Sequence, residues 1–229
     1  MDDADRRELL AVFALDAPGR LERIGHHLEA ADGLAAANET HSLSGAAATV
    51  GLEGLAAEAE RLEVELRAGA AMNDLRLRLE AIAALLPELE SEEPPAAAAR
   101  ADGHGRRTVL HVEDNPVNVK LVERALARRP NVRLLSATRA DAGLRAAGEA
   151  RPDLILLDLN LPDGSGQDLL RRLRDEPGTR DVPVVVVSAH TPAHSAQALH
   201  GLGIRDYLTK PIDIGRLLEL VDEHAPTAT

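Results

Sequence analysis

Five polar side chains in the second half of the chain each follow a short apolar run of residues. Glu113 and Asp114 follow VLHV, Asp158 follows LILL, Ser188 follows VVVV, and Lys210 follows DYLT. If the runs are parallel strands of one sheet, their carboxyl ends meet at the same edge, where ligands bind in such sheets. The five side chains are therefore expected to converge on one site.

The three acids predict a site for a divalent cation and a phosphoryl group. Carboxylates held close together repel one another unless a cation lies between them, and carboxylate oxygens suit Mg²⁺. A phosphoryl group on Asp158 would present oxygens to the metal ion, to the Lys210 ammonium and to the Ser188 hydroxyl, which favours in-line transfer. The sequence contains no glycine-rich phosphate-binding loop, so the phosphoryl group is expected to come from another protein.

A histidine in the first half, His41, stands out because of the small residues around it. On a helix it shares a face with Ser44, Gly45 and Ala48, opposite a face of apolar residues, so its imidazole is expected to point away from the core. Glycine within a helix costs about 1 kcal/mol relative to alanine, and Gly45 is interpreted as clearance for a phosphoryl group or a docking partner. An exposed imidazole can accept a phosphoryl group from an aspartyl phosphate and return it. No second histidine or acid lies at ligand spacing on that face, which argues against a metal site.

The elements that must position His41 are helices. In residues 1–90, apolar residues recur at helical spacing, and Ala, Leu, Glu and Arg, which favour helices, dominate. The expected helices cover, in chain order, residues 9–14, a stretch that opens at Pro18, and residues 34–50, 51–69 and 75–86. This part of the chain is therefore predicted to be an all-α helical bundle of four or five helices.

The pattern changes after a segment at residues 91–106, whose prolines, glycines and small residues indicate a linker. Five short apolar runs then alternate with five helical stretches. The helical stretches are NVKLVERALARR, ADAGLRAAGEA, GQDLLRRLRDE, PAHSAQALHGL and DIGRLLELVDEH. Such alternation is typical of an open parallel sheet with helices on both faces. Residues 107–225 are therefore predicted to form a second domain, an α/β doubly wound five-stranded parallel sheet.

Residues 107–225 resemble a response-regulator receiver domain. The resemblance rests on VEDNPVN at 112–118, LILLDLNLPDGSG at 154–166, VPVVVVSAH at 182–190 and DYLTKPID at 206–213. It implies a flavodoxin-like fold with strand order 2-1-3-4-5, with Asp158 as the phosphoacceptor and Mg²⁺ as the cofactor.

The resemblance also implies roles for the residues around Asp158. The expected Mg²⁺ ligands are Glu113, Asp114, Asp158 and the backbone carbonyl of Asn160. Lys210 is expected to bind phosphate, and the Lys210–Pro211 bond is expected to be cis. Ser188 and Tyr207 stand at the positions of the family's switch pair. A phosphoryl group on Asp158 would draw the Ser188 hydroxyl toward it and let Tyr207 turn inward.

Residues 1–90 resemble a histidine phosphotransfer domain, whose usual core reads His-x-Leu-Lys-Gly-Ser-x and is followed by a glycine. The corresponding string here is HSLSGAA at residues 41–47. Ser44 stands where lysine is usual, and Ala46 stands where serine is usual. The resemblance implies that His41 is a phosphoacceptor. The missing lysine bears on the rate of transfer or on the choice of partner, because a lysine would attract a phosphoryl group.

Composition narrows the classes of function. The formal net charge is −12, and residues 1–95 carry 20 acidic and 8 basic residues, so neither part has the basic excess of a DNA-binding domain. Phe13 and Tyr207 are the only residues of the Phe, Tyr and Trp types, which leaves almost nothing for bases to stack on. No cysteine, no secretory signal and no apolar run of roughly 18 residues is present. A cytoplasmic protein without nucleic-acid or membrane partners is expected.

These patterns together predict a two-component phosphorelay signalling protein in which His41 and Asp158 accept and pass phosphoryl groups. It is not expected to be an enzyme, apart from a receiver that promotes its own phosphorylation and dephosphorylation. The expected partners are a sensor or hybrid histidine kinase and other receiver domains, and a homodimer is left open.

Three other interpretations fit the same sequence. In the first, the bundle is a degenerate phosphotransfer fold used only for docking under the control of Asp158, which Ser44 and Ala46 favour somewhat. In the second, the chain is the C-terminal part of a larger hybrid histidine kinase, because no ATP-binding domain is visible. In the third, the carboxylate edge belongs to a metal-dependent phosphatase or other hydrolase, although Lys210 is its only evident general acid.

Overall fold

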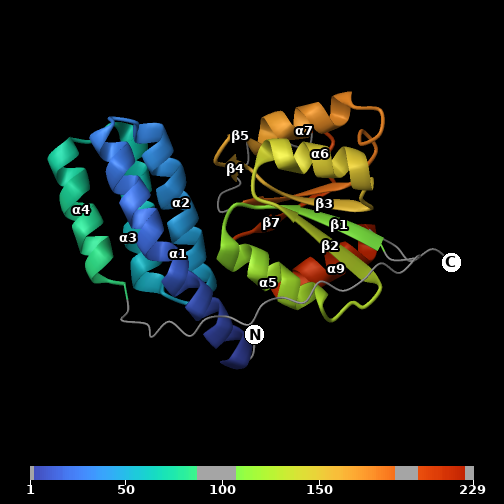
Figure 1. The fold of residues 1–229 in the computed structure, drawn as a ribbon, viewed down its shortest axis with the longest axis horizontal. Coiled ribbons are helices and arrows are strands. Elements are labelled where there is room, and N and C mark those ends of the chain that lie inside the picture. Colours follow the sequence, from blue (N-terminus) through green and yellow to red (C-terminus); the bar gives the residue numbers. More distant parts are fainter. Residues whose placement is uncertain (1–2, 87–106, 189–200, 225–229) are drawn as a thin grey trace. The chain divides into compact units, whose positions relative to one another are not determined.

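The structure, a computed structural model, describes residues 3–86, 107–188 and 201–224. The chain divides into two compact units, one on each side of residue 96. Figure 1 shows the described residues of both units. The predicted linker at 91–106, and all but the last two residues of the helix predicted from PAHSAQALHGL, lie outside the described residues. Among the described helices, none is long and apolar enough to cross a membrane.

The first unit is a helical bundle, as predicted for this half of the chain. Its described helices are α1 (Asp3–Glu29), α2 (Gly33–Thr49), α3 (Glu53–Ala68) and α4 (Met72–Ala84). The Asp32 side chain caps α2 by accepting a hydrogen bond from the Ala35 amide at 3.0 Å, and α3 ends at Gly69, whose φ of 72° suits glycine. Helix α3 packs along α2, the helix that carries His41.

The first helix differs from the sequence prediction, because it runs through Pro18 without a break. Two helices were expected here, the second opening at this proline. Proline inside a helix removes one hydrogen bond, but packing can compensate for that loss. The apolar side chains on the buried stripe of α1 keep one helical register on both sides of the proline: Leu9, Phe13, Ala17, Ile24 and Leu28.

A partly buried charge network joins α1 to α2 close in sequence to His41. The Arg20 side chain is only 3% exposed, and its Nη1 atom lies 3.2 Å from Oε2 of Glu39. Arg23 donates from Nε to the other oxygen of Glu39 at 3.1 Å. Removing one partner of a buried ion pair is strongly destabilising, because the remaining charge stays buried without compensation. Glu39 precedes His41 by two residues, so these contacts help to anchor the helix that carries the histidine.

The second unit is a doubly wound sheet. Its strands are β1 (Arg107–Val112), β2 (Val132–Ala137), β3 (Leu154–Asp158), β6 (Val184–Ser188) and β7 (Asp206–Thr209). All pair in parallel in the order β2-β1-β3-β6-β7, which confirms the predicted topology. Its described helices are α5 (Pro116–Leu126), α6 (Ala140–Ala150), α7 (Gly166–Asp175) and α9 (Ile214–His224). Helices α6 and α7 cover one face of the sheet, and α5 and α9 cover the other (Figure 1).

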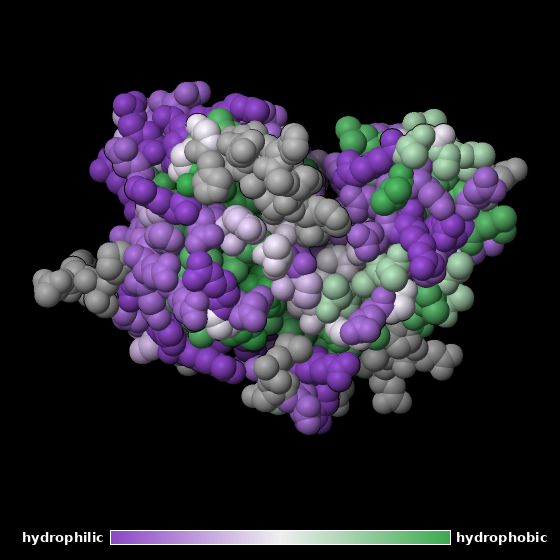
Figure 2. All heavy atoms as spheres, turned by 180° about the vertical axis from the view of Figure 1, so that it is seen from behind, coloured by the Kyte–Doolittle hydropathy of each residue, from purple (hydrophilic) through white to green (hydrophobic). Residues whose placement is uncertain are grey.

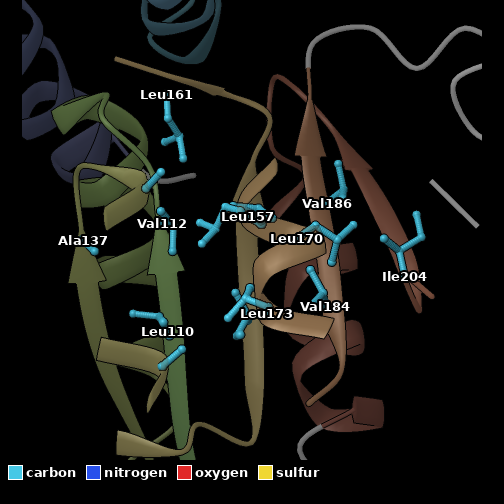
Figure 3. Close-up of a cluster of buried hydrophobic side chains, with 14 residues drawn as sticks. Leu110, Val112, Ala137, Leu157, Leu161, Leu170, Leu173, Val184, Val186 and Ile204 are labelled. Carbon is cyan, nitrogen blue, oxygen red and sulfur yellow. The ribbon is translucent and has the colours of Figure 1, made fainter. Parts of the chain in front are cut away.

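The sheet is buried on both faces, so its central strands are apolar throughout. Every residue of β3 and β6 is buried. Side chains alternate along a strand, and one set lies on the same face as α7 (Figure 3). The labelled members of this cluster include Leu110, Val112, Leu157, Val184 and Val186 from the strands, with Leu170 and Leu173 from α7. This packing holds the strand ends in place.

A short hairpin that the sequence did not predict follows β3. Strands β4 (Asn160–Leu161) and β5 (Gly164–Ser165) pair in antiparallel fashion, with Asn160 opposite Ser165. The hairpin lies between the end of β3 and the start of α7, so it borders the edge of the sheet where Asp158 ends its strand. Two-residue strands are below the usual strand length, which explains why no apolar alternation signals them.

The surface is mostly hydrophilic on the face shown in Figure 2. The most exposed of the described large apolar side chains are Leu34, Val64 and Leu77, each between 62% and 66% exposed. Single exposed apolar residues of this kind are normal for a folded protein.

Candidate functional site

Three carboxylates meet at the carboxyl edge of the parallel sheet. Glu113 and Asp114 follow β1, Asp158 ends β3, and each offers one oxygen so that the three oxygens lie within 4.8 Å of one another. Glu113 and Asp158 are almost completely buried, with 0% and 1% exposed. Strands β1 and β3 are neighbours in the sheet, which is why residues more than 40 positions apart share this site.

Lys210 places a buried ammonium group among these carboxylates. Its Nζ atom lies 2.7 Å from Oδ2 of Asp158 and 3.0 Å from Oε1 of Glu113. The backbone amide of Lys210 donates to the Ser188 carbonyl at 2.9 Å, so the end of β7 is tied to the end of β6. The Lys210–Pro211 bond is cis, as the family resemblance implied.

Burial and the neighbouring charges, taken together, raise the pKa values of Glu113 and Lys210. Burial, together with the neighbouring carboxylates Asp158 and Asp114, raises the pKa of Glu113 to about 8, although Lys210 acts against this rise. Burial acts to lower the pKa of Lys210, but the Asp158 and Glu113 carboxylates outweigh it and raise that pKa above its ordinary value. The ammonium therefore stays charged, and it lies among three carboxyl groups, of which Glu113 keeps its proton at neutral pH in the absence of a metal ion.

The donor set of this cluster fits a hard divalent cation. Full ionisation of the three carboxyl groups beside a single ammonium would leave an excess of negative charge, which a bound cation would offset. Oxygen atoms are the ligands that Mg²⁺ takes in proteins, often from one or two carboxylates with water and phosphate oxygens.

Two asparagines that sequence reasoning passed over orient the Glu113 carboxylate. The Asn118 side-chain amide donates to Oε1 of Glu113 at 3.2 Å, and the Asn115 backbone amide donates to the same atom at 3.3 Å. Asn115 also caps α5, because its side-chain oxygen accepts from the Val117 amide at 3.0 Å. Asparagine followed by proline is a helix-start signal, so the string NPVN could have indicated this capping in advance.

The backbone of Asp158 requires a glycine nearby. An added Cβ on Gly166, the first residue of α7, would lie 2.2 Å from the Asp158 carbonyl oxygen, too close for any side chain. The Asn160 amide donates to Oδ1 of Asp158 at 3.0 Å, which orients the carboxylate. The segment after β3 therefore packs closely against the backbone of Asp158 and also donates a hydrogen bond to its side chain.

The two residues of the expected switch pair lie on neighbouring strands. Ser188 ends β6 and is 4% exposed. Tyr207 lies on the edge strand β7, pairs in register with Val186, and is 42% exposed, so its side chain is outward.

One buried histidine borders the cluster without taking part in it. His111 lies on β1, is fully buried, and neither of its ring nitrogens has a hydrogen-bond partner among the described residues. Burial and then the nearby Lys210 ammonium lower the pKa of His111 to about 3. Its imidazole is therefore neutral at neutral pH.

In the helical unit, His41 contacts an acid from another helix. Its Nδ1 atom lies 2.9 Å from Oε2 of Glu63 on α3, and Oε1 of Glu63 accepts a hydrogen bond from Nε of Arg67 at 2.9 Å. Burial acts to raise the pKa of Glu63, but the contacts with His41 and Arg67 outweigh it and lower that pKa below its ordinary value. Glu63 is therefore ionised, and an ionised carboxylate only accepts hydrogen bonds.

His41 itself is less exposed than its helix pattern predicted. The side chain was expected to face solvent, but the residue is 9% exposed, and Nε2 is buried without a hydrogen-bond partner among the described residues. One reason is that α3 packs along α2 and brings Glu63 against the imidazole. The helical period could not show this, because Glu63 comes from a different helix.

Of the small residues that follow His41, Ser44 contacts α3 and Gly45 is buried. Ser44, at the position where lysine was expected, donates from its hydroxyl to the Ala56 carbonyl at 3.0 Å. Gly45 is buried one turn after His41, and its carbonyl accepts from the Thr49 hydroxyl at 2.9 Å. A cation does lie next to this site, because Arg67 donates a hydrogen bond to Glu63, the partner of His41.

Comparison with known proteins identifies both units. A family model for the response regulator receiver domain matches residues 109–222, and a model for the Hpt domain matches residues 8–94. The chain belongs to the two-component phosphorelay proteins. It joins a histidine phosphotransfer (Hpt) domain to a receiver domain, and such domains interact with histidine kinases or other phosphorelay components.

Two curated relatives match the receiver half. The histidine-protein kinase BarA of Shigella flexneri is 37% identical over 123 residues, which are 52% of this chain and 13% of BarA. The polar-differentiation response regulator DivK of Brucella anthropi is 32% identical over 118 residues, which are 52% of this chain and 95% of DivK. The chain therefore matches a small part of BarA and nearly all of DivK.

A solved structure with the receiver fold matches the same half. It is the receiver domain of sensor histidine kinase PA1611 from Pseudomonas aeruginosa, 29% identical, with a TM-score of 0.48 over 52% of this chain and 98% of that one. That structure is described with a magnesium ion coordinated in its active site cleft. Receiver domains generally bind Mg²⁺ at an acidic site, and the described residues of this receiver include a buried acidic cluster.

Proposed function

We propose that Asp158 and His41 are the two residues through which this phosphorelay protein accepts and passes phosphoryl groups. The observation that carries the proposal is the buried cluster in which the Lys210 ammonium lies 2.7 Å from Asp158, beside Glu113 and Asp114. Ionisable groups with shifted pKa values gather at functional sites, and phosphoryl transfer uses charged groups of this kind.

In the receiver, the Asp158 carboxylate is the nucleophile. One of its oxygens forms a bond to phosphorus while the bond between phosphorus and the donor's leaving atom breaks, and no proton needs to move on the receiver. Lys210 lies where it can neutralise charge on the phosphoryl oxygens, and the Ser188 hydroxyl ends the neighbouring strand where it can donate to them.

Glu113, Asp114, Asp158 and the backbone carbonyl of Asn160 would hold Mg²⁺ in this receiver. The bound ion would offset the charge of the carboxylates and of the phosphoryl oxygens during in-line transfer. The same charges would let the receiver promote its own phosphorylation and dephosphorylation, so any catalysis belongs to this one site.

In the Hpt domain, Glu63 determines which nitrogen of His41 reacts. Ionised Glu63 can only accept a hydrogen bond, so Nδ1 of His41 carries the proton and Nε2 keeps its lone pair. Nε2 forms the bond to phosphorus, and the aspartyl oxygen of the donor leaves as a carboxylate. The proton stays on Nδ1, and the positive charge that develops on the ring is stabilised by Glu63.

The receiver would signal through Ser188 and Tyr207. A phosphoryl group on Asp158 offers a new acceptor to the Ser188 hydroxyl at the end of β6. Movement of that hydroxyl would open space for Tyr207, which is 42% exposed on β7 in this structure, to turn inward. The surface around β7 would then differ between the two states, and partners could read that difference.

A second candidate function, docking without phosphorylation of the bundle, is favoured by one observation. Nε2 of His41 is buried, and the Ser44 hydroxyl is engaged with the backbone of α3 instead of offering a positive charge. In that case the Hpt domain binds partners while Asp158 alone is phosphorylated.

The partners of both functions are of one class. A sensor or hybrid histidine kinase, or another receiver domain, would donate to or accept from Asp158 and His41. The bundle at 1–90 and the receiver at 107–225 would be joined by a linker at 91–106, which would keep them at high effective concentration whether or not they exchange a phosphoryl group.

A labelling experiment on the full chain tests the proposal. A phosphorylated histidine donor and Mg²⁺ are offered to the wild type, to His41→Gln and to Asp158→Ala. Phosphohistidine is lost in acid and aspartyl phosphate is lost in base, so treatment of the labelled protein assigns each phosphate. The matched controls are His26→Gln and Asp168→Asn, whose side chains are 80% and 67% exposed.

Each result has a distinct meaning. Label on both residues of the wild type supports the relay. His41→Gln should then lose only the acid-labile label, whereas Asp158→Ala should lose the label on Asp158 and any label that reaches His41 through it. Label on Asp158 alone supports the docking function. Turnover of small phosphate esters without stable label would favour a hydrolase, and label that survives in both variants would remove the proposal.

A further inference from the structure

The hairpin that follows β3 is fastened to a helix on the same edge of the receiver by Asp163. This residue lies between β4 and β5, and its side chain is only 7% exposed. Its Oδ1 atom accepts a hydrogen bond from the Ala140 amide at 2.8 Å, and Oδ2 accepts one from the Asp141 amide at 3.1 Å. Asp163 therefore satisfies the first two amides of α6 from more than 20 positions away.

Helix α6 depends on this contact because its own cap residue gives it none. Arg139 precedes the helix and makes no side-chain capping hydrogen bond. The first amides of a helix need an acceptor, and a carboxylate there also interacts favourably with the helix dipole. Burial acts to raise the pKa of Asp163, but the amide hydrogen bonds and nearby Arg139 outweigh it and lower that pKa. Both oxygens of Asp163 are thus charged acceptors.

The other end of the same hairpin borders the carboxylate cluster. The Asn160 amide donates to Oδ1 of Asp158 at 3.0 Å, and Asn160 pairs with Ser165 across the hairpin. The Gly166 amide donates to the Leu159 carbonyl at 2.8 Å and closes the base of the hairpin. Asp158 at the base and α6 at the tip are the two points at which these hydrogen bonds hold the hairpin.

We propose that Asp163 is a positioning residue for the phosphoacceptor site. Its two hydrogen bonds hold the tip of the hairpin on α6 and so fix the backbone of Asn160. The carbonyl of Asn160 is the proposed Mg²⁺ ligand beside Asp158. This inference rests on the proposed function of the carboxylate cluster. Groups that orient metal ligands commonly change metal affinity 10–100-fold when they are lost, so the contact matters even though Asp163 touches neither the metal ion nor the phosphoryl group.

The alternative is a purely structural role, in which Asp163 only caps α6. A cap stabilises its helix and is exchangeable with other capping residues, but its loss leaves metal affinity unchanged. Metal affinity and stability must therefore be measured separately on the same variants.

The test compares Asp163→Ala, Asp163→Asn and Asp141→Ala in the full chain. Mg²⁺ is titrated into each protein and followed by calorimetry, and unfolding in urea is measured in parallel without metal. Asp141 is the matched control, because its side chain is 58% exposed, carries the same charge at the same helix end, and takes no part in the hydrogen bond that its backbone amide makes to Asp163.

We expect Asp163→Ala to raise the dissociation constant for Mg²⁺ about tenfold. Asp163→Asn should raise it only about threefold, because the amide oxygen can replace one of the two acceptors. Asp141→Ala should leave it within about twofold of the wild type. Hydrogen exchange at the amides of residues 140 and 141 should speed up in Asp163→Ala.

Several outcomes would overturn the inference. If Asp163→Ala is folded, exchanges faster at residues 140 and 141, and still binds Mg²⁺ like the wild type, Asp163 is only a cap. If Asp163→Ala does not fold, Asp163→Asn decides alone: wild-type affinity overturns the inference, and weaker binding supports it. If the wild type itself binds no Mg²⁺, the proposed role of the cluster fails and this inference fails with it, whereas normal wild-type binding confines the failure to Asp163.

Discussion

Lys210 and Asp158 are 52 positions apart in the chain, yet Nζ of the lysine lies 2.7 Å from Oδ2 of the aspartate in a site from which water is almost excluded. The contact exists because β7 and β3 flank β6 in the sheet, so the residues at their ends face one another. The ammonium is held charged by the carboxylates around it. Burying a charge costs free energy, and removing one partner leaves the other charge without compensation. Substitution of either residue should therefore have a large, measurable effect.

Removal of the charge on Glu63 should slow phosphoryl transfer to His41. In Glu63→Gln, the amide can donate to Nδ1, which would place the imidazole proton on Nε2 and remove the reactive lone pair. We expect the transfer rate from a phosphorylated receiver to fall on the order of 10–100-fold. Rapid-quench labelling measures this rate. Glu60→Gln, an exposed position on the same helix, should transfer at the wild-type rate; equal rates in both variants would show that Glu63 does not orient His41.

Glu113 should make the metal-free receiver less stable as the pH rises from about 6.5 to about 8. The pKa of Glu113 is about 8 in the folded protein against an ordinary value of 4.5, so the folded state keeps a proton that the unfolded chain has released. The stability that this proton provides is present at low pH and is lost as the pH rises through the folded pKa. Below 6.5, the ordinary value of His111, that histidine acts in the opposite direction.

The measurement for Glu113 is unfolding of the full chain in urea, followed by signals of the receiver strands at a series of pH values. Glu113→Gln cannot ionise, so its curve should be flat where the wild-type curve falls. A wild-type curve that does not fall between pH 6.5 and 8 would contradict the prediction.

His111 should limit the stability of the receiver in acid. Its folded pKa is about 3 against an ordinary 6.5, so the unfolded chain takes up a proton that the folded protein refuses. The stability from the neutral imidazole is therefore present above pH 6.5 and is lost as the pH falls toward 3. His111→Leu should remove this acid loss. It should also raise the free energy of unfolding at neutral pH by about 1–2 kcal/mol, because two buried ring nitrogens without partners are removed.

The control for His111→Leu is His26→Leu, since the His26 side chain is 80% exposed. That variant should show the wild-type loss of stability in acid. If His111→Leu is instead destabilised at neutral pH, the imidazole has a partner that the described contacts do not include.

Two glycines of the receiver should respond in opposite ways to alanine. Gly166→Ala should lower the free energy of unfolding by about 1–3 kcal/mol, because the new Cβ would lie 2.2 Å from the Asp158 carbonyl oxygen and the backbone must shift. Gly148→Ala, at an exposed position of α6 with open space around it, should raise that free energy by about 0.5–1 kcal/mol. Urea unfolding checks both, and Gly166→Ala should also bind Mg²⁺ more weakly. Equal stabilities of the two variants would contradict the close packing at Asp158.

The fold of both halves could be predicted from local patterns. Apolar residues at helical spacing predict the bundle, and VVVV or LILL between helical stretches predicts a sheet buried on both faces. Because every parallel strand ends at the same edge, the carboxylates that follow two strands and the lysine that follows a third had to meet there. The order of the residues along the chain was sufficient for this part of the site.

Tertiary packing decided three features that local sequence patterns could not predict. Pro18 predicted the start of a helix, but α1 continues through it because its buried apolar residues lie on both sides of the proline. His41 reads as exposed on its own helix, but Glu63 of α3 meets its Nδ1 atom. Asp163 was given no role from the sequence, and in the structure it caps a helix that lies before it in the chain. The contacts of His41 and Asp163 join residues of different helices and loops, and the α1 stripe packs against other helices. How these elements align depends on the packing of their buried faces, which the hydrophobic period of a single helix or strand cannot show.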